Sequence, residues 1–254
     1  MTRVIKIGGR VQSDPALAGA LGRLWLESPA SFCVVHGGGE TVSALQMKLG
    51  MAPRFVAGRR FTSERDIQVL RMALSGVANK QLVSSLSAEA IRAVGISGED
   101  GALLIARAMN APLLGRVGRV TQVNDALVRL LLASGFLPVI SPVARDGECA
   151  TGGALNVNAD DAAAALAASL DAEELLLVSD VPGVMIDGVT VASLSADDAA
   201  QAISSGVASD GMATKLSAAL DALRQGVPQV RIGDIDSLGD PRLGTILMTA
   251  QQLA

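Results

Sequence analysis

Short runs of apolar, often β-branched residues alternate along the chain with longer segments of helical periodicity. This pattern predicts strands at residues 3–7, 32–36, 103–106, 116–120, 137–142, 174–179, 191–192 and 229–232. It predicts helices at residues 15–27, 40–49, 64–74, 80–92, 124–134, 159–170, 196–204 and 212–224. Several strands are unbroken apolar runs, which is typical of a sheet covered by helices on both faces. The expected fold is therefore α/β, a three-layer αβα sandwich around a largely parallel central sheet.

Local signals refine these elements. Asp14 followed by Pro15 is typical of a helix start, and Asn124, Ser195 and Asp210 are expected to cap helices in the same way. Residues 144–153 are rich in glycine and polar side chains and are expected to form a loop. We expect two lobes that share one sheet, an N-terminal lobe of residues 1–172 and a C-terminal lobe of residues 173–254.

Composition excludes several classes of protein. Of the 254 residues 50% are hydrophobic, which argues against disorder, and no apolar run reaches the roughly 20 residues of a membrane helix. A net charge of −4 and an aromatic content of 2% argue against a nucleic-acid partner. Two cysteines, Cys33 and Cys149, make no disulfide framework, and no signal-peptide pattern begins the chain, so a cytoplasmic location is expected.

The single histidine, His36, narrows the possible chemistry further. Zinc sites built on paired histidines lack a second ligand, and a Ser-His-Asp triad would have to use His36 itself. The GxSxG, Walker GxxxxGK[ST] and kinase HRD/DFG motifs are absent from the sequence.

Three glycine-bearing turns follow three predicted strands, at residues 6–9, 36–39 and 180–183. Turns at the carboxyl ends of parallel strands face the ligand crevice, and glycines there let backbone N–H groups approach an anion. Two such turns could hold a polyphosphate, although each glycine could also serve only a tight turn.

Lysine usage points to two positions. The chain contains 4 Lys against 17 Arg, yet Lys6 lies within the apolar first strand, where a buried ammonium needs a partner. Lys215 lies near the start of a helix, where a point charge could meet phosphate. Lys48 and Lys80 are more simply explained as solvated helix positions.

Further polar side chains are candidates for holding a substrate. Asn156, Asn158 and Asp160 precede the alanine-rich helix, where they could bind a small polar molecule or merely cap the helix. Arg60, in the segment Gly58-Arg59-Arg60-Phe61-Thr62, could clamp a carboxylate, or the arginine doublet could be surface charge.

The order K-I-G-G, H-G-G-G, G-x-R-x-T, G-x-x-N-K, N-V-N-A-D, S-D-V-P-G and D-G-M-x-x-K resembles the amino acid kinase family. It is most similar to the branch that phosphorylates N-acetyl-L-glutamate in arginine biosynthesis. The resemblance extends from Lys6 to Lys215. It implies ATP-dependent phosphorylation of the γ-carboxylate of N-acetyl-L-glutamate, with Mg²⁺ bridging the nucleotide phosphates. A carboxylate acceptor is already ionised and needs no general base, which suits a chain with one histidine.

The resemblance also assigns roles to residues. Lys6 and Lys215 match the lysines that stabilise the transferring phosphoryl group, and Asp160 matches the aspartate that orients them. The residues expected to bind the acceptor are Gly38, Gly39, Arg60, Asn156 and Asn158. Those expected to bind the nucleotide are Gly8, Gly9, Asp180, Val181, Pro182, Gly183, Val184, Met185, Val207, Ala208 and Ser209. The N-terminal lobe would bind the acceptor and dimerise, and the C-terminal lobe would bind ATP.

Two departures from the family pattern concern the acceptor. Arg59 stands where an apolar residue is usual, and Phe61 where a smaller branched residue is common, which could reshape the acyl pocket. Another acyl-glutamate or a carrier-linked aminoadipate therefore stays open as the acceptor. A catalytically silent nucleotide-binding or regulatory role is a separate alternative, and the presence of both Lys6 and Lys215 argues against it. Because the first strand begins near residue 3, the N-terminal helix of arginine-inhibited relatives has no room, and an unregulated homodimer is expected.

Overall fold

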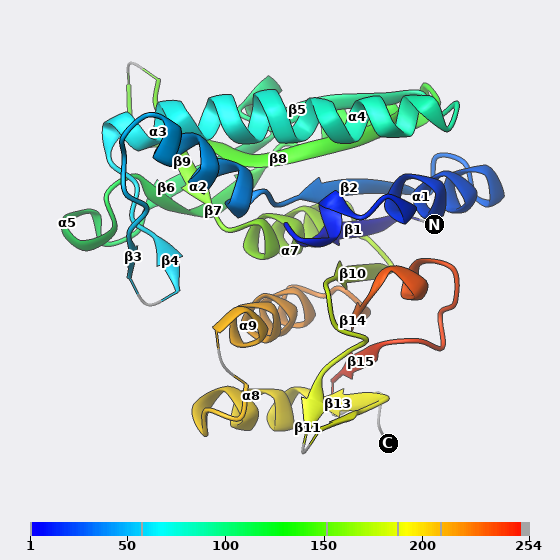
Figure 1. Ribbon diagram of the computed structural model, residues 1–254. Helices are drawn as coiled ribbons and strands as arrows, with labels where there is room; N and C mark the ends of the chain where they lie inside the picture. The colour runs from blue at the N-terminus through cyan, green and yellow to red at the C-terminus, as the bar shows by residue number, and fades with distance from the viewer. Residues whose placement is uncertain (1, 57, 151, 187, 209, 250–254) are drawn as a thin grey trace.

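The computed structural model describes residues 2–56, 58–150, 152–186, 188–208 and 210–249. In this part of the chain one 11-stranded sheet has the order β13-β15-β14-β10-β1-β2-β8-β6-β7-β9, with β5 pairing with β8. Its strands are β1 (Arg3–Ile7), β2 (Phe32–His36), β5 (Ala93–Gly98), β6 (Leu104–Ala108), β7 (Val117–Val123), β8 (Leu137–Asp146), β9 (Ala154–Val157), β10 (Glu174–Val178), β13 (Ser193–Ser195), β14 (Gln229–Gly233) and β15 (Thr245–Met248). Figure 1 shows the sheet passing from the green elements at the top to the orange and red C-terminal elements below.

The centre of this sheet is parallel and its flanks are mixed. Strands β14, β10, β1, β2 and β8 pair in parallel, as does β5 with β8. The pairs β14–β15, β6–β7 and β8–β9 are antiparallel. The predicted α/β class with a largely parallel central sheet is confirmed, and strands on both sides of residue 172 share the sheet, since β1 pairs with β10.

Helices cover the two faces of the sheet. They are α1 (Ala16–Glu27), α2 (Gly39–Lys48), α3 (Glu64–Leu70), α4 (Asn79–Ala88), α5 (Ala111–Leu114), α6 (Ala126–Ala133), α7 (Ala159–Ser169), α8 (Ala196–Ser204) and α9 (Asp210–Arg224). Short 3-10 turns are η1 (Val11–Ser13), η3 (Asp100–Ala102) and η4 (Ile235–Leu238), and the π-helical segment η2 (Arg71–Ala78) joins α3 to α4. Two small hairpins are β3 (Phe55–Val56) with β4 (Arg59–Arg60), and β11 (Met185–Ile186) with β12 (Val189–Thr190).

The alternation of side chains along the strands assigns the helices to faces. Lys6 of β1 points to α7, whereas His36 of β2 points to the start of α4. The small buried residues of α7, among them Ala163 and Ala167, let this helix pack closely on the sheet and against α9. This packing completes the αβα sandwich.

Several local expectations need correction. The predicted helix 80–92 ends at Ala88, because Ala90 takes a positive φ of 60° and the next apolar run forms β5. The periodicity predicted no strand at the positions of β9 and β15. Residues 191–192 were predicted to form a strand, but they lie between β12 and β13. The loop expected at 144–153 begins later, since β8 continues to Asp146.

The capping predictions have mixed outcomes. Ser195 caps α8 by accepting from Asp198 N at 3.0 Å, and Asp14 Oδ1 accepts from Ala16 N at 2.8 Å at the start of α1. Asn124 does not cap a helix: its amide donates to the carbonyl of Gly101 instead. The side chain of Asp210 lies outside the described residues. No helix in the described ranges is long and apolar enough to cross a membrane.

Candidate active site

Three turns meet at the carboxyl ends of β2, β1 and β10. Ile7 lies in register with both His36 and Val178, so the three strands end side by side. Gly8 N donates to Val178 O at 2.9 Å, and Gly37 N donates to Ile7 O at 3.0 Å. The glycine turns that the sequence separates by many residues are therefore neighbours.

Backbone amides gather where these turns touch. A Cβ atom at Gly9 would lie 3.5 Å from Gly38 N and 3.6 Å from Gly39 N. Gly38 has a φ of 141°, and a Cβ there would collide with Leu74 at 2.8 Å. Because Gly39 also begins α2, N–H groups and the positive end of a helix dipole face the same spot, which suits an anion.

Lys6 and Asp160 form a buried ion pair beside these turns. Lys6 Nζ lies 2.7 Å from Asp160 Oδ1, and the two side chains are 7% and 6% exposed. Asp160 lies in the first turn of α7, whose N-cap Asn158 accepts from Asp160 N at 2.8 Å. Asp160 Oδ1 has no hydrogen bond of good geometry, so it can still accept from a further donor.

Lys215 approaches the same carboxylate from α9. Burial lowers its pKa below the ordinary 10.5, and the charge of Lys6 lowers it further, while Asp160 and Asp180 oppose the shift. The two lysines, from opposite ends of the chain, are thus close enough for their charges to interact. The shared role in phosphoryl transfer that the family resemblance implies for these lysines stays a prediction.

A cavity of about 260 Å³ opens in front of Lys6. It brings together the predicted residues Lys6, Gly9, Gly38, Gly39, Arg60, Asn156 and Asn158. Its other lining residues are Gly37, Val42, Phe55, Gly58, Arg59, Leu70, Leu74, Val117, Pro142, Val157 and Ala159. We call it the acceptor cavity. Gly8, Asp160 and Lys215 are not among its lining residues.

Arg60 is held by side chains that the sequence did not reveal. It donates to Gln46 Oε1 at 2.6 Å, to Gly39 O at 2.9 Å and to Ser43 Oγ at 2.8 Å. Gln46 in turn donates to Asp66 Oδ1 at 2.7 Å. Burial lowers the pKa of Arg60, and the nearby Asp66 opposes that shift. The guanidinium group of Arg60 is thus held in one orientation, and its geometry suits the binding of a carboxylate.

Gln46 and Asp66 are the main residues missed at this site. One signal was available, because Ser63 and Asp66 have capping-box spacing at the start of α3. Burial raises the pKa of Asp66, but hydrogen bonds from Ser63 and Gln46 and the charge of Arg60 together hold the pKa below its usual value. Nothing in the sequence pattern of α2 singles out Gln46.

The two asparagines have different positions. Asn156 donates to Thr62 Oγ1 at 3.0 Å, and Thr62 donates to Arg60 O at 3.0 Å, which connects β9 to the residues after β4. Asn158 caps α7, the simpler of the two roles considered for it, and it also lines the acceptor cavity. Phe61 packs its ring under Arg54 at 3.6 Å and is absent from the cavity lining.

A second, largely aliphatic cavity of about 160 Å³ lies in the C-terminal part of the chain. It is lined by Val181, Gly183, Val184, Met185, Ile186, Ala202, Val207, Ala208 and Met212. Six of these were predicted to bind nucleotide, whereas Ile186, Ala202 and Met212 were missed. Pro182 is absent from its lining, and Ser209 lies outside the described residues. We call it the nucleotide cavity.

Asp180 is not among the residues that line the nucleotide cavity. It accepts from Arg10 Nη1 at 2.8 Å, and this hydrogen bond lowers the pKa of Asp180. Arg10 Nε also lies 3.6 Å from Glu40 Oε1, so Arg10 bridges the second glycine turn and the third.

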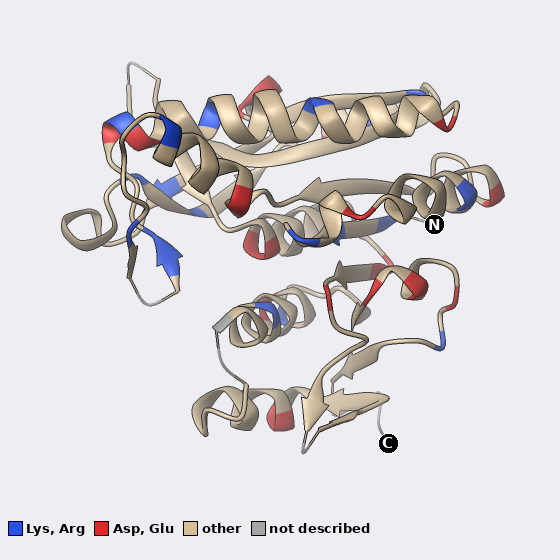
Figure 2. Ribbon diagram, in the orientation of Figure 1, with Lys and Arg blue, Asp and Glu red and all other residues tan. Residues whose placement is uncertain are grey.

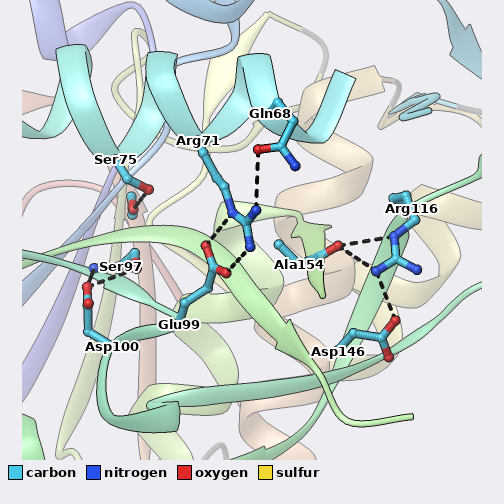
Figure 3. A network of polar contacts seen from close by, with 10 residues as sticks. Gln68, Arg71, Ser75, Ser97, Glu99, Asp100, Arg116, Asp146 and Ala154 are labelled. Carbon is cyan, nitrogen blue, oxygen red and sulfur yellow. Dashed lines mark hydrogen bonds and ion pairs between the residues drawn. The ribbon is translucent and has the colours of Figure 1, made fainter. Parts of the chain in front are cut away.

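Two ion pairs join segments that neighbour residues of the acceptor cavity in the sequence (Figure 3). Arg71 on η2 forms an ion pair with Glu99. Leu70, the last residue of α3, and Leu74 on η2 line the acceptor cavity. Arg116 binds Asp146 at 3.0 Å, and its backbone N donates to Thr62 O at 2.6 Å. The hydrogen bond from Arg116 attaches the segment that follows β4 to the start of β7.

His36 has a structural role. It is fully buried, its Nδ1 lies 2.7 Å from Gly37 O, and its Nε2 lies 3.1 Å from Asn79 Nδ2. These partners assign a proton to Nδ1 and leave Nε2 as acceptor. Burial lowers the pKa of His36 to about 4, so the ring is neutral at pH 7.

Comparison with known proteins agrees with this geometry. The model of the amino acid kinase family matches residues 1–234. The chain belongs to the amino acid kinase family. The predicted family and fold are therefore confirmed.

Relatives of known name extend the comparison. The acetylglutamate kinase of Geobacillus kaustophilus is 41% identical over 91% of this chain and 89% of its own length. That of Rubrobacter xylanophilus is 44% identical over 89% of this chain and 87% of its own length. The crystal structure of smu.665 from Streptococcus mutans superposes with a TM-score of 0.86 and 26% identity over 97% of this chain and 98% of that one.

Proposed function

We propose that this family member transfers the γ-phosphoryl group of ATP to the γ-carboxylate of N-acetyl-L-glutamate, forming N-acetyl-L-glutamyl 5-phosphate. The observation that carries the proposal is the buried Lys6–Asp160 pair beside a cavity that also holds Arg60 and the glycine turns. The two acetylglutamate kinases, each more than 40% identical, support this acceptor. The reaction is the second step of arginine biosynthesis.

The residues present suit ATP and Mg²⁺. The amides of Gly9, Gly38 and Gly39 form a concave anion site that a side chain at Gly9 would fill. The aliphatic nucleotide cavity suits a flat base. The described residues contain no cluster of three acidic, histidine or cysteine side chains that could hold a metal. Mg²⁺ keeps several waters and is often held largely by nucleotide phosphates, where it would neutralise part of their charge.

The chain's own residues supply positioning and charge. Arg60 and Asn156 hold the acceptor so that its ionised γ-carboxylate faces Lys6, and no base is required. An oxygen of that carboxylate bonds to the γ-phosphorus as the bond from this phosphorus to the bridging β–γ oxygen breaks, and ADP leaves. Lys6, Lys215 and the glycine amides offset the charge on the phosphoryl oxygens, while Asp160 keeps both lysines in place.

We also propose that the N-terminal lobe binds the acceptor and forms the dimer interface, and that the C-terminal lobe binds ATP. The proposed assembly is a homodimer, and the proposed location is the cytoplasm. Light scattering coupled to size-exclusion chromatography tests the dimer directly, and a monomer mass would remove it.

The activity itself can be tested by trapping the product. Purified protein is incubated with ATP, Mg²⁺ and hydroxylamine, which converts an acyl phosphate to a coloured hydroxamate. The acceptors compared are N-acetyl-L-glutamate, L-glutamate, N-acetyl-L-aspartate and N-acetyl-L-aminoadipate. We expect strong signal with N-acetyl-L-glutamate alone. Signal chiefly with another acceptor would change the substrate, and no signal with any of them would contradict the proposal.

A further inference from the structure

Neighbouring arginines on β4 point to opposite sides of the β3–β4 hairpin, because side chains alternate along a strand. Arg60 reaches α2, as described above. Arg59 reaches α7, where its Nη1 and Nη2 both lie 3.0 Å from Asp161 Oδ2. Figure 2 shows the basic strand β4 and the acidic first turn of α7 that this pair joins. The hairpin is thus attached to both helices whose N-termini border the acceptor cavity.

The pair also forms part of a wall. Arg59 lines the acceptor cavity and, in addition, a separate cavity of about 230 Å³ between α7 and α9. Asp161 and Arg119 also line this cavity between α7 and α9. Loss of the Arg59–Asp161 contact would therefore open the acceptor cavity toward the space behind it.

Ion pairs on a protein surface usually contribute little to stability. The Arg59–Asp161 pair differs from these because it is largely buried. The side chains of Arg59 and Asp161 are only 25% and 19% exposed. Burial raises the pKa of Asp161, as does the neighbouring charge of Asp160, whereas Arg59 and Arg119 lower it, so its ionised form depends on these arginines.

The hairpin depends on such attachments because it is small. Each of its strands has two residues, and a two-stranded hairpin has little stability of its own in water. Its polar contacts with the body of the protein, among the described residues, include those of Arg60, the hydrogen bonds around Thr62 and the Arg59–Asp161 pair. Of these, only the last reaches the helix that carries Asp160.

We propose that Arg59 and Asp161 form a clasp that holds the β3–β4 hairpin against α7, which makes Arg59 a positioning residue for the acceptor. The structural part of the proposal needs no substrate, while its effect on catalysis rests on the proposed function.

Hydrogen exchange tests the structural part. The variants are Asp161→Asn, Arg59→Leu and the double variant, with Glu99→Gln as a matched control that breaks the comparably exposed Arg71–Glu99 pair. In the clasp variants we expect the β3 and β4 amides to exchange about tenfold faster or more, with β1 unchanged. Hairpin amides that exchange as fast in the wild-type protein as in Asp161→Asn would overturn the clasp, as would equal acceleration in Glu99→Gln.

Kinetics tests the effect on the acceptor. We expect the clasp variants to raise the KM for N-acetyl-L-glutamate about tenfold while kcat and the KM for ATP stay within about twofold. The double variant should be no worse than the poorer single variant, because both remove one interaction. Additive losses, or an equal loss in ATP binding, would overturn the positioning role. If the wild-type protein does not phosphorylate this acceptor, the proposed function fails, and the exchange experiment still decides the clasp.

Discussion

The acceptor cavity and the nucleotide cavity are built in different ways. Around the acceptor cavity Lys6, Arg60 and Asn156 each have a fixed polar partner within 3.0 Å. The nucleotide cavity is lined mainly by aliphatic side chains such as Val184 and Met212. The first site fixes donors in advance for a small charged molecule, whereas the second offers apolar surface to a larger one.

This difference predicts unequal sensitivity to substitution. A misplaced charged donor loses both its contact with the substrate and its own partner, which leaves buried polar groups unpaired. Apolar binding is roughly proportional to buried area, so small changes of shape cost less. The following experiments, in order of decreasing effect, test whether the two cavities differ in this way.

Replacing Lys6 should have the largest effect. We expect Lys6→Met to lower kcat by about 10²–10³, the usual cost of removing a donor that stabilises developing charge. Circular dichroism should show that the fold is retained, and Lys48→Met, on the exposed end of α2, serves as the control. Turnover in Lys6→Met close to that of the control would remove Lys6 from the catalytic machinery.

Arg60→Lys should act on the acceptor alone. Lysine cannot form a planar fork, and the three contacts of Arg60 with Gln46, Gly39 and Ser43 would be lost with it. We expect the acceptor KM to rise about 10- to 100-fold, with the KM for ATP unchanged. Steady-state kinetics, with Arg129→Lys on α6 as control, measures this. A matching rise in the KM for ATP would mean that the two cavities are not independent.

Lowering the pH should destabilise the folded protein through the protonation of His36. Its pKa is about 4 in the folded protein and 6.5 in the reference state, so only the unfolded chain takes up a proton between these values. Stability is therefore lost as pH falls below 6.5, by about 2 kcal/mol at pH 5. Urea denaturation at pH 7, 6 and 5 should show this loss in the wild-type protein, and a smaller loss in His36→Gln. Parallel pH profiles of the two proteins would contradict the assignment.

Sequence periodicity identified the elements that carry the glycine turns. Strands β1 and β2 were predicted at their observed bounds, because runs of four and five consecutive buried residues leave little ambiguity. It failed at Ala93–Gly98, where apolar residues follow a helix at spacings that fit either structure. The short strands β9 and β15 each pair with two neighbouring strands and take their form from these partners, which no local pattern reveals.

For the site, motifs indicated the residues that touch a ligand but not those that hold them. Lys6, Arg60 and Asn156 stand in recognisable motifs, and the structure gathers them around one cavity. Gln46 and Asp161 depend on contacts between segments 14 and 102 residues apart, so they become visible only in three dimensions.

The smallest effect is expected at the nucleotide cavity, from Gly183→Ala. A Cβ atom there would lie 2.6 Å from Thr245 Oγ1 and 2.8 Å from Thr190 Cγ2, so the cavity wall must shift. Thr245 Oγ1 accepts from Val184 N at 2.8 Å, and displacing it moves the backbone that lines the cavity. We expect the KM for ATP to rise about fivefold, near 1 kcal/mol, with the acceptor KM unchanged. Gly19→Ala on α1, where an added Cβ meets ordinary contacts at 3.5 Å, is the control. A loss as large as that of Arg60→Lys would show that the apolar cavity is as sensitive to shape as the polar one, and the contrast between them would not hold.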